Sequence, residues 1–223
     1  MTRQLAFDLP LRTALGREDF FVSATNAQAL AALDGWRDWP RGKMLLIGPP
    51  GSGKTHLAHV WAEMTGAGMA PAATLAGADL AALAALPALV VEDCTDLAHS
   101  PAGQEALFHL HNMLAAHHAP LLLTASSPVR DWGLTLPDLA SRMQAAAITR
   151  LDPPDDALLS AVLIKLFSDR QISVNPALVA YLLPRMERSF DAARALVARL
   201  DAEALARGCA VTRSLAASLL DND

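Results

Sequence analysis

The segment that most constrains this chain is GPPGSGKT, residues 48–55, which follows a short aliphatic stretch at 44–47. A glycine-rich loop between a strand and a helix lets backbone N–H groups converge on phosphate oxygens, and the helix N-terminus favours negative charge there. In such a loop a lysine reaches the β- and γ-phosphoryl oxygens, and a threonine hydroxyl contacts Mg²⁺. Lys54 and Thr55 occupy these positions. The segment therefore predicts a phosphate loop that binds a nucleotide.

A second aliphatic stretch, residues 88–91, ends in two adjacent acids, Glu92 and Asp93. Carboxylates at the end of a buried strand are costly unless they serve a cation, and Mg²⁺ prefers oxygen ligands. We expect Asp93 to bind Mg²⁺ together with Thr55, with Glu92 as the alternative acid. Cys94 then stands where an ATPase normally has the carboxylate that orients or deprotonates water, and a thiol is a poor substitute in that role.

Aliphatic runs of strand length alternate with helical stretches up to about residue 150, which predicts an α/β fold with a parallel sheet covered by helices on both faces. The expected strands are 44–47, 89–91 and 121–123, and the expected helices are 24–39, ending near Gly35, and 101–118. A break at DPPDD follows Leu151, and after it come helical stretches at about 155–169, 175–186, 189–206 and 212–220. We therefore expect an extended arm at 1–17, an α/β nucleotide-binding domain at 18–151 and a smaller all-helical domain at 152–223.

Composition excludes several classes of protein. Hydrophobic residues make up 52% of the 223 residues and aromatic residues only 5%, which predicts an aliphatic core and excludes a disordered chain. The net charge is −5, and no basic cluster is visible along the sequence, so we do not expect direct binding to nucleic acid. Two distant cysteines, no recognisable signal peptide and no apolar run of membrane-spanning length predict a cytoplasmic protein without a membrane partner.

Several segments resemble a known family. They are DFFV at 19–22 followed by Asn26, GPPGSGKTHLA at 48–58, LFHLHNML at 107–114 and LPDLASRM at 136–143. Together they resemble the AAA+ core of bacterial DnaA and, more closely, the Hda-like DnaA homologues that regulate the inactivation of DnaA. The resemblance runs from about residue 3 to the C-terminus, and it implies an AAA+ P-loop sheet flanked by helices, a helical lid, and ADP or ATP with Mg²⁺ as ligands.

The resemblance also extends the nucleotide site beyond the loop. The residues that it implies for nucleotide binding are Val22, Gly48, Pro50, Gly51, Ser52, Gly53, Lys54, Thr55, His56 and Arg194. Two sensor-like positions depart from the family, because Ser126 stands where an acid is usual and Asp191 stands where the lid has an arginine. Arg194 follows Asp191 by three residues on the same helical face and is the candidate to replace that arginine. With Cys94, these departures predict stable nucleotide binding and weak intrinsic hydrolysis.

Two further segments imply partners. QLAFDL is similar to the motif by which Hda-like proteins dock on the replicative sliding clamp, the β subunit of DNA polymerase III, with Gln4, Leu5, Phe7 and Leu9 as contacts. Packing of these side chains on the protein's own core is the alternative. Arg142 matches the family's arginine finger, a catalytic residue that acts on nucleotide held by a neighbouring subunit, and self-association through this face stays open.

The sequence thus predicts a negative regulator of chromosomal replication initiation. It would dock on the clamp and stimulate hydrolysis of DnaA-bound ATP through Arg142, contacting DNA and the nucleoid only through partners. The alternative is an autonomous P-loop ATPase that acts as a helicase loader or remodeller, and a small-molecule kinase is the weakest reading. Four histidines do not complete a metal-ligand spacing, and we expect them on helix surfaces: His109, His111, His117 and His118. The tryptophans are expected to serve packing or an interface, and Cys94 is expected to be a buried cysteine at the end of a strand.

Overall fold

A computed structural model describes residues 21–220 of the chain. The predicted N-terminal arm, with Gln4, Leu5, Phe7 and Leu9, lies outside the described residues. The strands are β1 (Lys43–Ile47), β2 (Gly68–Pro71), β3 (Leu89–Glu92), β4 (Leu121–Ala125) and β5 (Ala147–Arg150). They form one parallel sheet in the order β2-β3-β4-β1-β5. The central strands β1 and β4 are buried along their whole length, as their continuous aliphatic sequences predicted.

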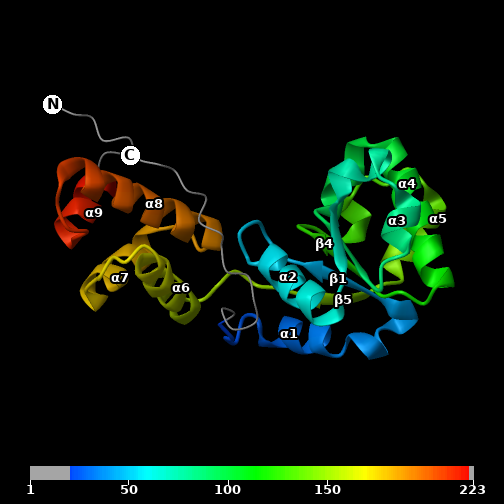
Figure 1. Ribbon diagram of the computed structural model, residues 1–223, viewed down its shortest axis with the longest axis horizontal. Helices are drawn as coiled ribbons and strands as arrows, with labels where there is room; N and C mark the ends of the chain where they lie inside the picture. Colours follow the sequence, from blue (N-terminus) through cyan, green and yellow to red (C-terminus); the bar gives the residue numbers. More distant parts are fainter. Residues whose placement is uncertain (1–20, 221–223) are drawn as a thin grey trace.

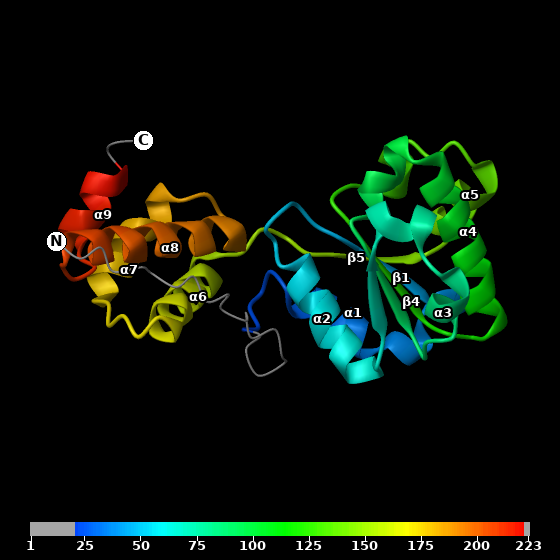
Figure 2. The same ribbon diagram turned by 45° about the horizontal axis from the view of Figure 1, so that its top comes forward.

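Helices cover both faces of this sheet (Figure 2). On one face, Met44 and Leu46 pack with α1 (Ala27–Asp34) and α2 (Lys54–Thr65). On the other face, Leu45 packs in the core that includes α3 (Leu80–Ala84), α4 (Pro101–Ala116) and α5 (Pro137–Gln144). Because successive strand side chains point to opposite faces, one aliphatic strand supplies both cores. The predicted α/β fold with a parallel sheet is confirmed.

The part of the chain after Leu151 is helical as far as the structure describes it. It comprises α6 (Asp156–Asp169), α7 (Pro176–Leu182), α8 (Phe190–Arg207) and α9 (Arg213–Leu220). These helices lie to one side of the sheet and its covering helices (Figure 1), and they pack around a core of their own that includes Phe167 and Val197. Side-chain caps begin them: Asp155 accepts from Leu158 N at 2.8 Å before α6.

Two strands were not anticipated. β2 has the sequence GMAP, with the poor strand formers glycine and proline, and β5 is an edge strand on which Ile148 is exposed. Neither shows the buried aliphatic run that marks β1 and β4. Three of the four tryptophans are buried in the core, and Trp36 is half-buried against it. Trp39 and Trp61 stack with centroids 5.2 Å apart. None of the helices within residues 21–220 is long and apolar enough to cross a membrane.

Candidate functional site

The glycine-rich loop connects the last residue of β1 to the first residue of α2. Gly51 has φ of 68° and Gly53 has φ of 97°, a left-handed backbone that other residues adopt only with strain. Lys54, the first residue of α2, is buried, and its Nζ donates to the carbonyl oxygen of Pro49 at 3.0 Å. The loop therefore has the strand-to-helix setting that the sequence predicted for a phosphate loop.

The start of α8 rests directly on this loop. The backbone N–H of Phe190 donates to the carbonyl oxygen of Gly51 at 2.8 Å. A Cβ atom on Gly51 would lie 2.5 Å from Cβ of Ser189, and one on Gly53 would lie 2.8 Å from Cε2 of Phe190. The two glycines thus also allow the helical part of the chain to approach the loop, a contact that the loop sequence alone did not reveal.

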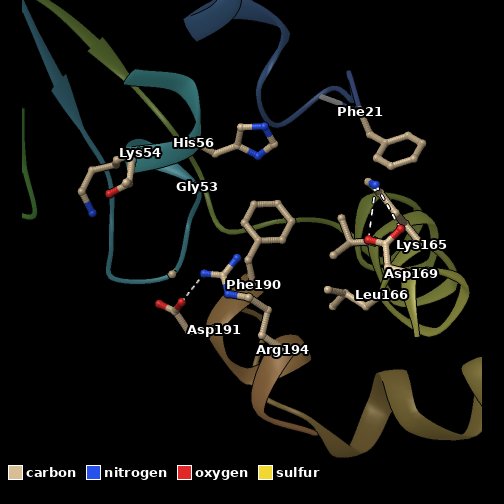
Figure 3. A pocket seen from close by; sticks show the side chains of 13 residues that line it. Phe21, Gly53, Lys54, His56, Lys165, Leu166, Asp169, Phe190, Asp191 and Arg194 are labelled. Carbon is tan, nitrogen blue, oxygen red and sulfur yellow. Dashed lines mark hydrogen bonds and ion pairs between the residues drawn. The ribbon is translucent and has the colours of Figure 1, made fainter. Parts of the chain in front are cut away.

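A cavity of about 350 Å³ lies between the loop and the helices α6 and α8 (Figure 3). Its lining residues are Phe21, Gly51, Gly53, Lys54, Thr55, His56, Val162, Lys165, Leu166, Asp169, Phe190, Asp191 and Arg194. Apolar side chains from three segments, Phe21, Leu166 and Phe190, contribute to it, and the loop supplies the start of α2. An apolar cavity beside a helix N-terminus suits a nucleotide, with its base among the apolar groups and its phosphates at the loop.

Most, but not all, of the predicted nucleotide-binding residues line this cavity. Gly51, Gly53, Lys54, Thr55, His56 and Arg194 do so, whereas Val22, Gly48, Pro50 and Ser52 are absent from its lining. Val22 is exposed, and its neighbour Phe21 lines the cavity instead. The side chain of Asn26 donates to the carbonyl oxygen of Phe21 at 2.8 Å and holds this segment in place.

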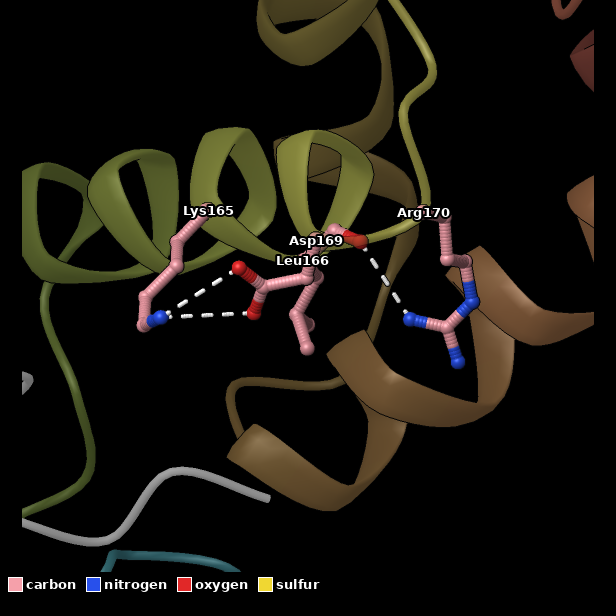
Figure 4. A network of polar contacts seen from close by, with 4 residues as sticks. All are labelled: Lys165, Leu166, Asp169 and Arg170. Carbon is pink, nitrogen blue, oxygen red and sulfur yellow. Dashed lines mark hydrogen bonds and ion pairs between the residues drawn. The ribbon is translucent and has the colours of Figure 1, made fainter. Parts of the chain in front are cut away.

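Helix α6 contributes residues that sequence reasoning missed. Lys165 Nζ lies 3.3 Å from both carboxylate oxygens of Asp169, and the two side chains line the cavity (Figures 3 and 4). Figure 4 also shows Arg170, whose guanidinium donates to the carbonyl oxygen of Leu166 at 3.2 Å. The spacing of Lys165 and Asp169 along α6 is that of an ordinary helical ion pair, so nothing in the sequence indicates that the pair faces a cavity.

Three acids surround the loop lysine. Burial lowers the pKa of Lys54, and the carboxylates of Asp93, Asp191 and Glu92 oppose this shift, in that order of strength. Oε1 of Glu92 is buried without a hydrogen-bond partner among the described groups. Oxygen-rich surroundings of this kind suit a hard divalent cation. The described residues contain no group of three or more histidines, cysteines or acids suited to a metal, so protein oxygens would complete the ion's shell only together with nucleotide phosphates.

The positions expected to limit hydrolysis differ in their surroundings. Cys94 is fully buried, its thiol donates to the carbonyl oxygen of Val91 at 3.5 Å, and burial raises the pKa of that thiol. The Ser126 hydroxyl lies 3.4 Å from the Thr95 hydroxyl. Neither group lines the cavity. Cys94 therefore has a packing environment, as expected.

Asp191 and Arg194 form an ion pair at the mouth of the loop (Figure 3). Both side chains line the cavity. The guanidinium that the sequence nominated as a replacement for the lid arginine is thus placed at the site, but it is held by the acid that occupies the original position.

Arg142 lies near the amino-terminal ends of the strands, whereas its own phosphate loop lies at their carboxyl-terminal ends. Its carbonyl oxygen accepts from Nζ of Lys43 at 2.6 Å, and Lys43 is the first residue of β1, whereas the loop follows the last. The guanidinium is exposed, with Cζ 5.1 Å from the ring centroid of Phe108. A strand of this length spans roughly 16 Å at about 3.3 Å per residue, so the side chain cannot reach nucleotide held in its own cavity.

Two expectations about basic groups were wrong. His111 is buried rather than on the helix surface, and its Nε2 lies 3.1 Å from Nζ of Lys43. Burial is the main cause that lowers the pKa of His111. A basic cluster also exists, because residues far apart in sequence line one cavity with these two side chains: Arg37, Arg41, His118 and Arg142.

Known proteins share this fold. No family model matches the chain. DnaA of Thermus thermophilus is 26% identical over 134 residues, which are 60% of this chain and 31% of that protein, so the chain spans about a third of the length of the curated relatives it matches. Domain III of Thermotoga maritima DnaA superposes with a TM-score of 0.80 at 18% identity, covering 96% of this chain and 98% of that one. AMPPCP-bound DnaA of Aquifex aeolicus gives 0.68 at 16%, covering 82% and 64%. The chain therefore has an AAA+ fold like that of DnaA.

Proposed function

We propose that this chain binds ADP or ATP with Mg²⁺ and regulates chromosomal replication initiation by acting on a DnaA partner. Sequence similarity to DnaA and the shared AAA+ fold support a role connected with replication. The cavity beside the loop supports nucleotide binding, and a DnaA of the same fold has been solved with the ATP analogue AMPPCP. In the cavity, Lys54 would bind the phosphoryl oxygens while Phe21 and Phe190 enclose the base.

Thr55 and Asp93 are the residues proposed to hold Mg²⁺, with Glu92 beside them. When bound, this ion neutralises charge on the β- and γ-phosphoryl oxygens. The buried, unpartnered Oε1 of Glu92 and the attraction between Asp93 and Lys54 support a cation at this place. The carboxylates would then hold the ion while Lys54 holds the phosphoryl oxygens, and Cys94, at the position of the usual water-activating acid, would not activate water.

The position of Arg142 is the observation that carries the proposed action on a partner. An exposed guanidinium at the end of β1 opposite to its own phosphate loop can contact only nucleotide that another molecule holds. A planar guanidinium suits the charge that spreads over the phosphoryl oxygens in the transition state. We propose DnaA-bound ATP as that nucleotide, with Arg142 as the catalytic residue supplied in trans.

Weak intrinsic hydrolysis is part of the same proposal. Cys94 is buried away from the cavity, Ser126 faces Thr95, and Asp191 pairs with Arg194. None of these arrangements activates a water or adds positive charge to a γ-phosphate. The chain would therefore keep its own nucleotide as a structural ligand while stimulating the partner's hydrolysis.

Docking on the sliding clamp through Gln4, Leu5, Phe7 and Leu9 is proposed from the QLAFDL segment alone. A peptide of residues 1–11 should bind the purified clamp, and the same peptide with Gln4, Leu5 and Phe7 changed to alanine should not. Equal binding of both peptides would remove the clamp from the proposal.

The main experiment measures hydrolysis of DnaA-bound ATP with clamp and DNA present. Removing a trans-acting arginine costs about 10³-fold or more in rate, so Arg142→Ala should abolish the stimulation. Arg142→Lys, which keeps the charge without the planar fork, should recover little of it. Arg130→Ala, which removes another exposed arginine, is the matched control and should stimulate normally.

Stimulation by the Arg142→Ala protein would contradict the finger assignment. The chain's own hydrolysis, measured without DnaA and with single-stranded DNA, separates the remaining alternative. A steady rate well above background would favour an autonomous loader or remodeller over a regulator that acts on a partner.

A further inference from the structure

A second cavity, of about 470 Å³, lies at the amino-terminal end of β1, whereas the phosphate loop follows its carboxyl-terminal end. Cationic and titratable side chains from separate segments line it: Arg37, Arg41, Lys43, His111, His118 and Arg142. Among the residues that the structure describes, no aspartate or glutamate lines this cavity. A concentration of positive charge without acids is notable in a chain whose net charge is −5.

Lys43 forms the floor of the cavity. It is only 2% exposed, and its Nζ has two neutral partners, Nε2 of His111 at 3.1 Å and the carbonyl oxygen of Arg142 at 2.6 Å. Burial, together with the charges of Arg41 and Arg142, lowers the pKa of Lys43 to about 8, and burial is the largest of these causes. Buried cations are normally paired with an anion, because an unpaired buried charge is costly.

Three arginines, Arg37, Arg41 and Arg142, line the rest of this cavity. Arg41 has a left-handed backbone, with φ of 55°, within the short turn Pro40–Gly42. Arg37 lies with Cζ 4.3 Å from the ring centroid of Trp36, and Arg142 lies over Phe108. A non-glycine residue in this backbone region persists only where its surroundings hold it, and such residues concentrate at binding sites.

We propose that this cavity binds a compact oligophosphate, with inorganic diphosphate as the smallest representative. Arginine forks match pairs of phosphoryl oxygens, and the Lys43 ammonium supplies a point charge at the floor. A cavity of about 470 Å³ is within the range of small-ligand sites. The anion would give the buried lysine the counter-charge that the protein does not provide.

A single nucleic-acid strand fits these observations less well. Proteins that bind single strands without sequence preference combine a basic groove with aromatic faces on which bases stack. Trp39 also lines the cavity, but its ring is buried and stacked on Trp61. Among residues 21–220, the lining of this cavity therefore offers charge for phosphates and no free aromatic face for a base.

This site goes beyond the proposed function and does not depend on it. Its ligand would lie at the amino-terminal end of β1, and nucleotide in the phosphate loop would lie at the carboxyl-terminal end. Because Arg142 belongs to both proposals, an oligophosphate in this cavity would compete with a partner's nucleotide for the same guanidinium. The cavity would then offer a way to regulate the arginine without changing the chain's own nucleotide.

The test is calorimetric titration of inorganic diphosphate into the whole chain at fixed ionic strength. All proteins carry Lys54→Ala, so that the phosphate loop does not contribute. One binding event should remain, and adding Lys43→Met or Arg41→Ala should weaken it at least about tenfold, the loss expected for one charge-assisted contact. Adding Arg185→Ala, which removes an exposed arginine from the helical part, should leave the affinity unchanged.

Arg41 is exposed, so its variant tests the site even if the change at buried Lys43 disturbs folding. Loss of all diphosphate binding with Lys54→Ala alone would overturn the proposal, because the loop would then be the only site. Undiminished binding in both the Lys43→Met and Arg41→Ala proteins would also overturn it. So would tighter binding of a thymidine decanucleotide than of diphosphate, which would assign the cavity to nucleic acid instead. Failure of the proposed nucleotide site appears separately, as failure of the Lys54 chain to bind ADP or ATP.

Discussion

Two buried lysines lie near opposite ends of β1, and the charged groups around them have opposite signs. Lys54, at the phosphate loop, is attracted by carboxylates, with Asp93 the strongest. Lys43, at the start of β1, is repelled by the guanidinium groups of Arg41 and Arg142. Burial alone is common to both. The charges of the side chains around each lysine therefore distinguish what the two places can bind.

The difference indicates two kinds of phosphate ligand. A lysine among carboxylates suits a nucleotide that arrives with a divalent cation, because the acids hold the metal while the lysine holds the phosphates. A lysine among other cations suits an anion without a metal. The net charge of −5 for the whole chain does not predict the local charge around either lysine. The following substitutions separate the two environments.

The largest effect is expected at the phosphate loop. Lys54→Ala removes the charge that contacts the phosphoryl oxygens and should weaken binding of ADP and ATP by about 100-fold, since charge-assisted contacts of this kind contribute roughly 2–3 kcal/mol. Titration of a fluorescent adenine nucleotide in the presence of Mg²⁺ measures this. Lys43→Met is the matched control, and an equal loss in that variant would show that the two lysines do not serve separate sites.

The contact between the loop and α8 gives the next largest effect. Gly53→Ala combines a φ of 97° with a Cβ atom 2.8 Å from the Phe190 ring, so we expect a loss of about 2–4 kcal/mol in the free energy of unfolding. Gly208→Ala has a φ of 63° and no atom within 4 Å, and it should cost about 1 kcal/mol. Gly77→Ala has neither feature and should be nearly neutral. Urea unfolding of the three variants tests this order, and equal losses would contradict the close contact.

The phosphate loop was predictable because its residues are consecutive and its strand-to-helix setting is encoded locally. The helices after Leu151 were predictable for a similar reason, because capping residues such as Asp155 begin them. The close contact between Phe190 and Gly53 was not predictable, because these residues are far apart in sequence. The same holds for the basic cavity, because Arg37 and Arg142 are neighbours only after the chain has folded.

Edge strands and cavity walls carry weaker sequence signals for physical reasons. β5 lies at the edge of the sheet and leaves Ile148 exposed, so its sequence lacks the continuous buried aliphatic run of β1. Lys165 and Asp169 form a helical ion pair that looks the same in sequence whether it faces water or a nucleotide cavity. Local rules therefore found the element that binds phosphate and not the side chains that enclose the ligand.

The surroundings of Lys43 predict that the stability of the folded chain depends on pH. Because the pKa of Lys43 falls to about 8 in the folded chain from an ordinary value of 10.5, the unfolded chain binds more protons between these two values. Stability conferred by this site therefore rises as pH increases through that window. Relative to Lys43→Met, the native chain should gain about 1 kcal/mol between pH 7 and pH 9. Burial lowers the pKa of His111 from its ordinary value of 6.5, so this side chain adds little to the change in this interval.

Urea unfolding at pH 7, 8 and 9 measures this gain, and at pH 7 the Lys43→Met protein should be the more stable of the two. Lys43→Arg is the control that keeps a permanent charge, because arginine does not lose its proton in this range. Its stability should lack the rise between pH 7 and pH 9. Parallel pH profiles for native and Lys43→Met proteins would show that Lys43 has an ordinary environment.

The smallest effect concerns the acid that restrains Arg194. Asp191→Ala would free the Arg194 guanidinium and remove a negative charge that faces the phosphate site, so nucleotide affinity should rise. Because both side chains are largely exposed, solvent screening limits the gain to about two- to fivefold. The gain should be greater for ATP than for ADP, since ATP brings one more phosphate. Asp201→Ala breaks another ion pair, with the mostly buried Arg170 and away from the cavity, and should leave both affinities unchanged. An equal rise for ADP and ATP would place Asp191 away from the terminal phosphate, and no rise at all would show that Arg194 does not replace the lid arginine.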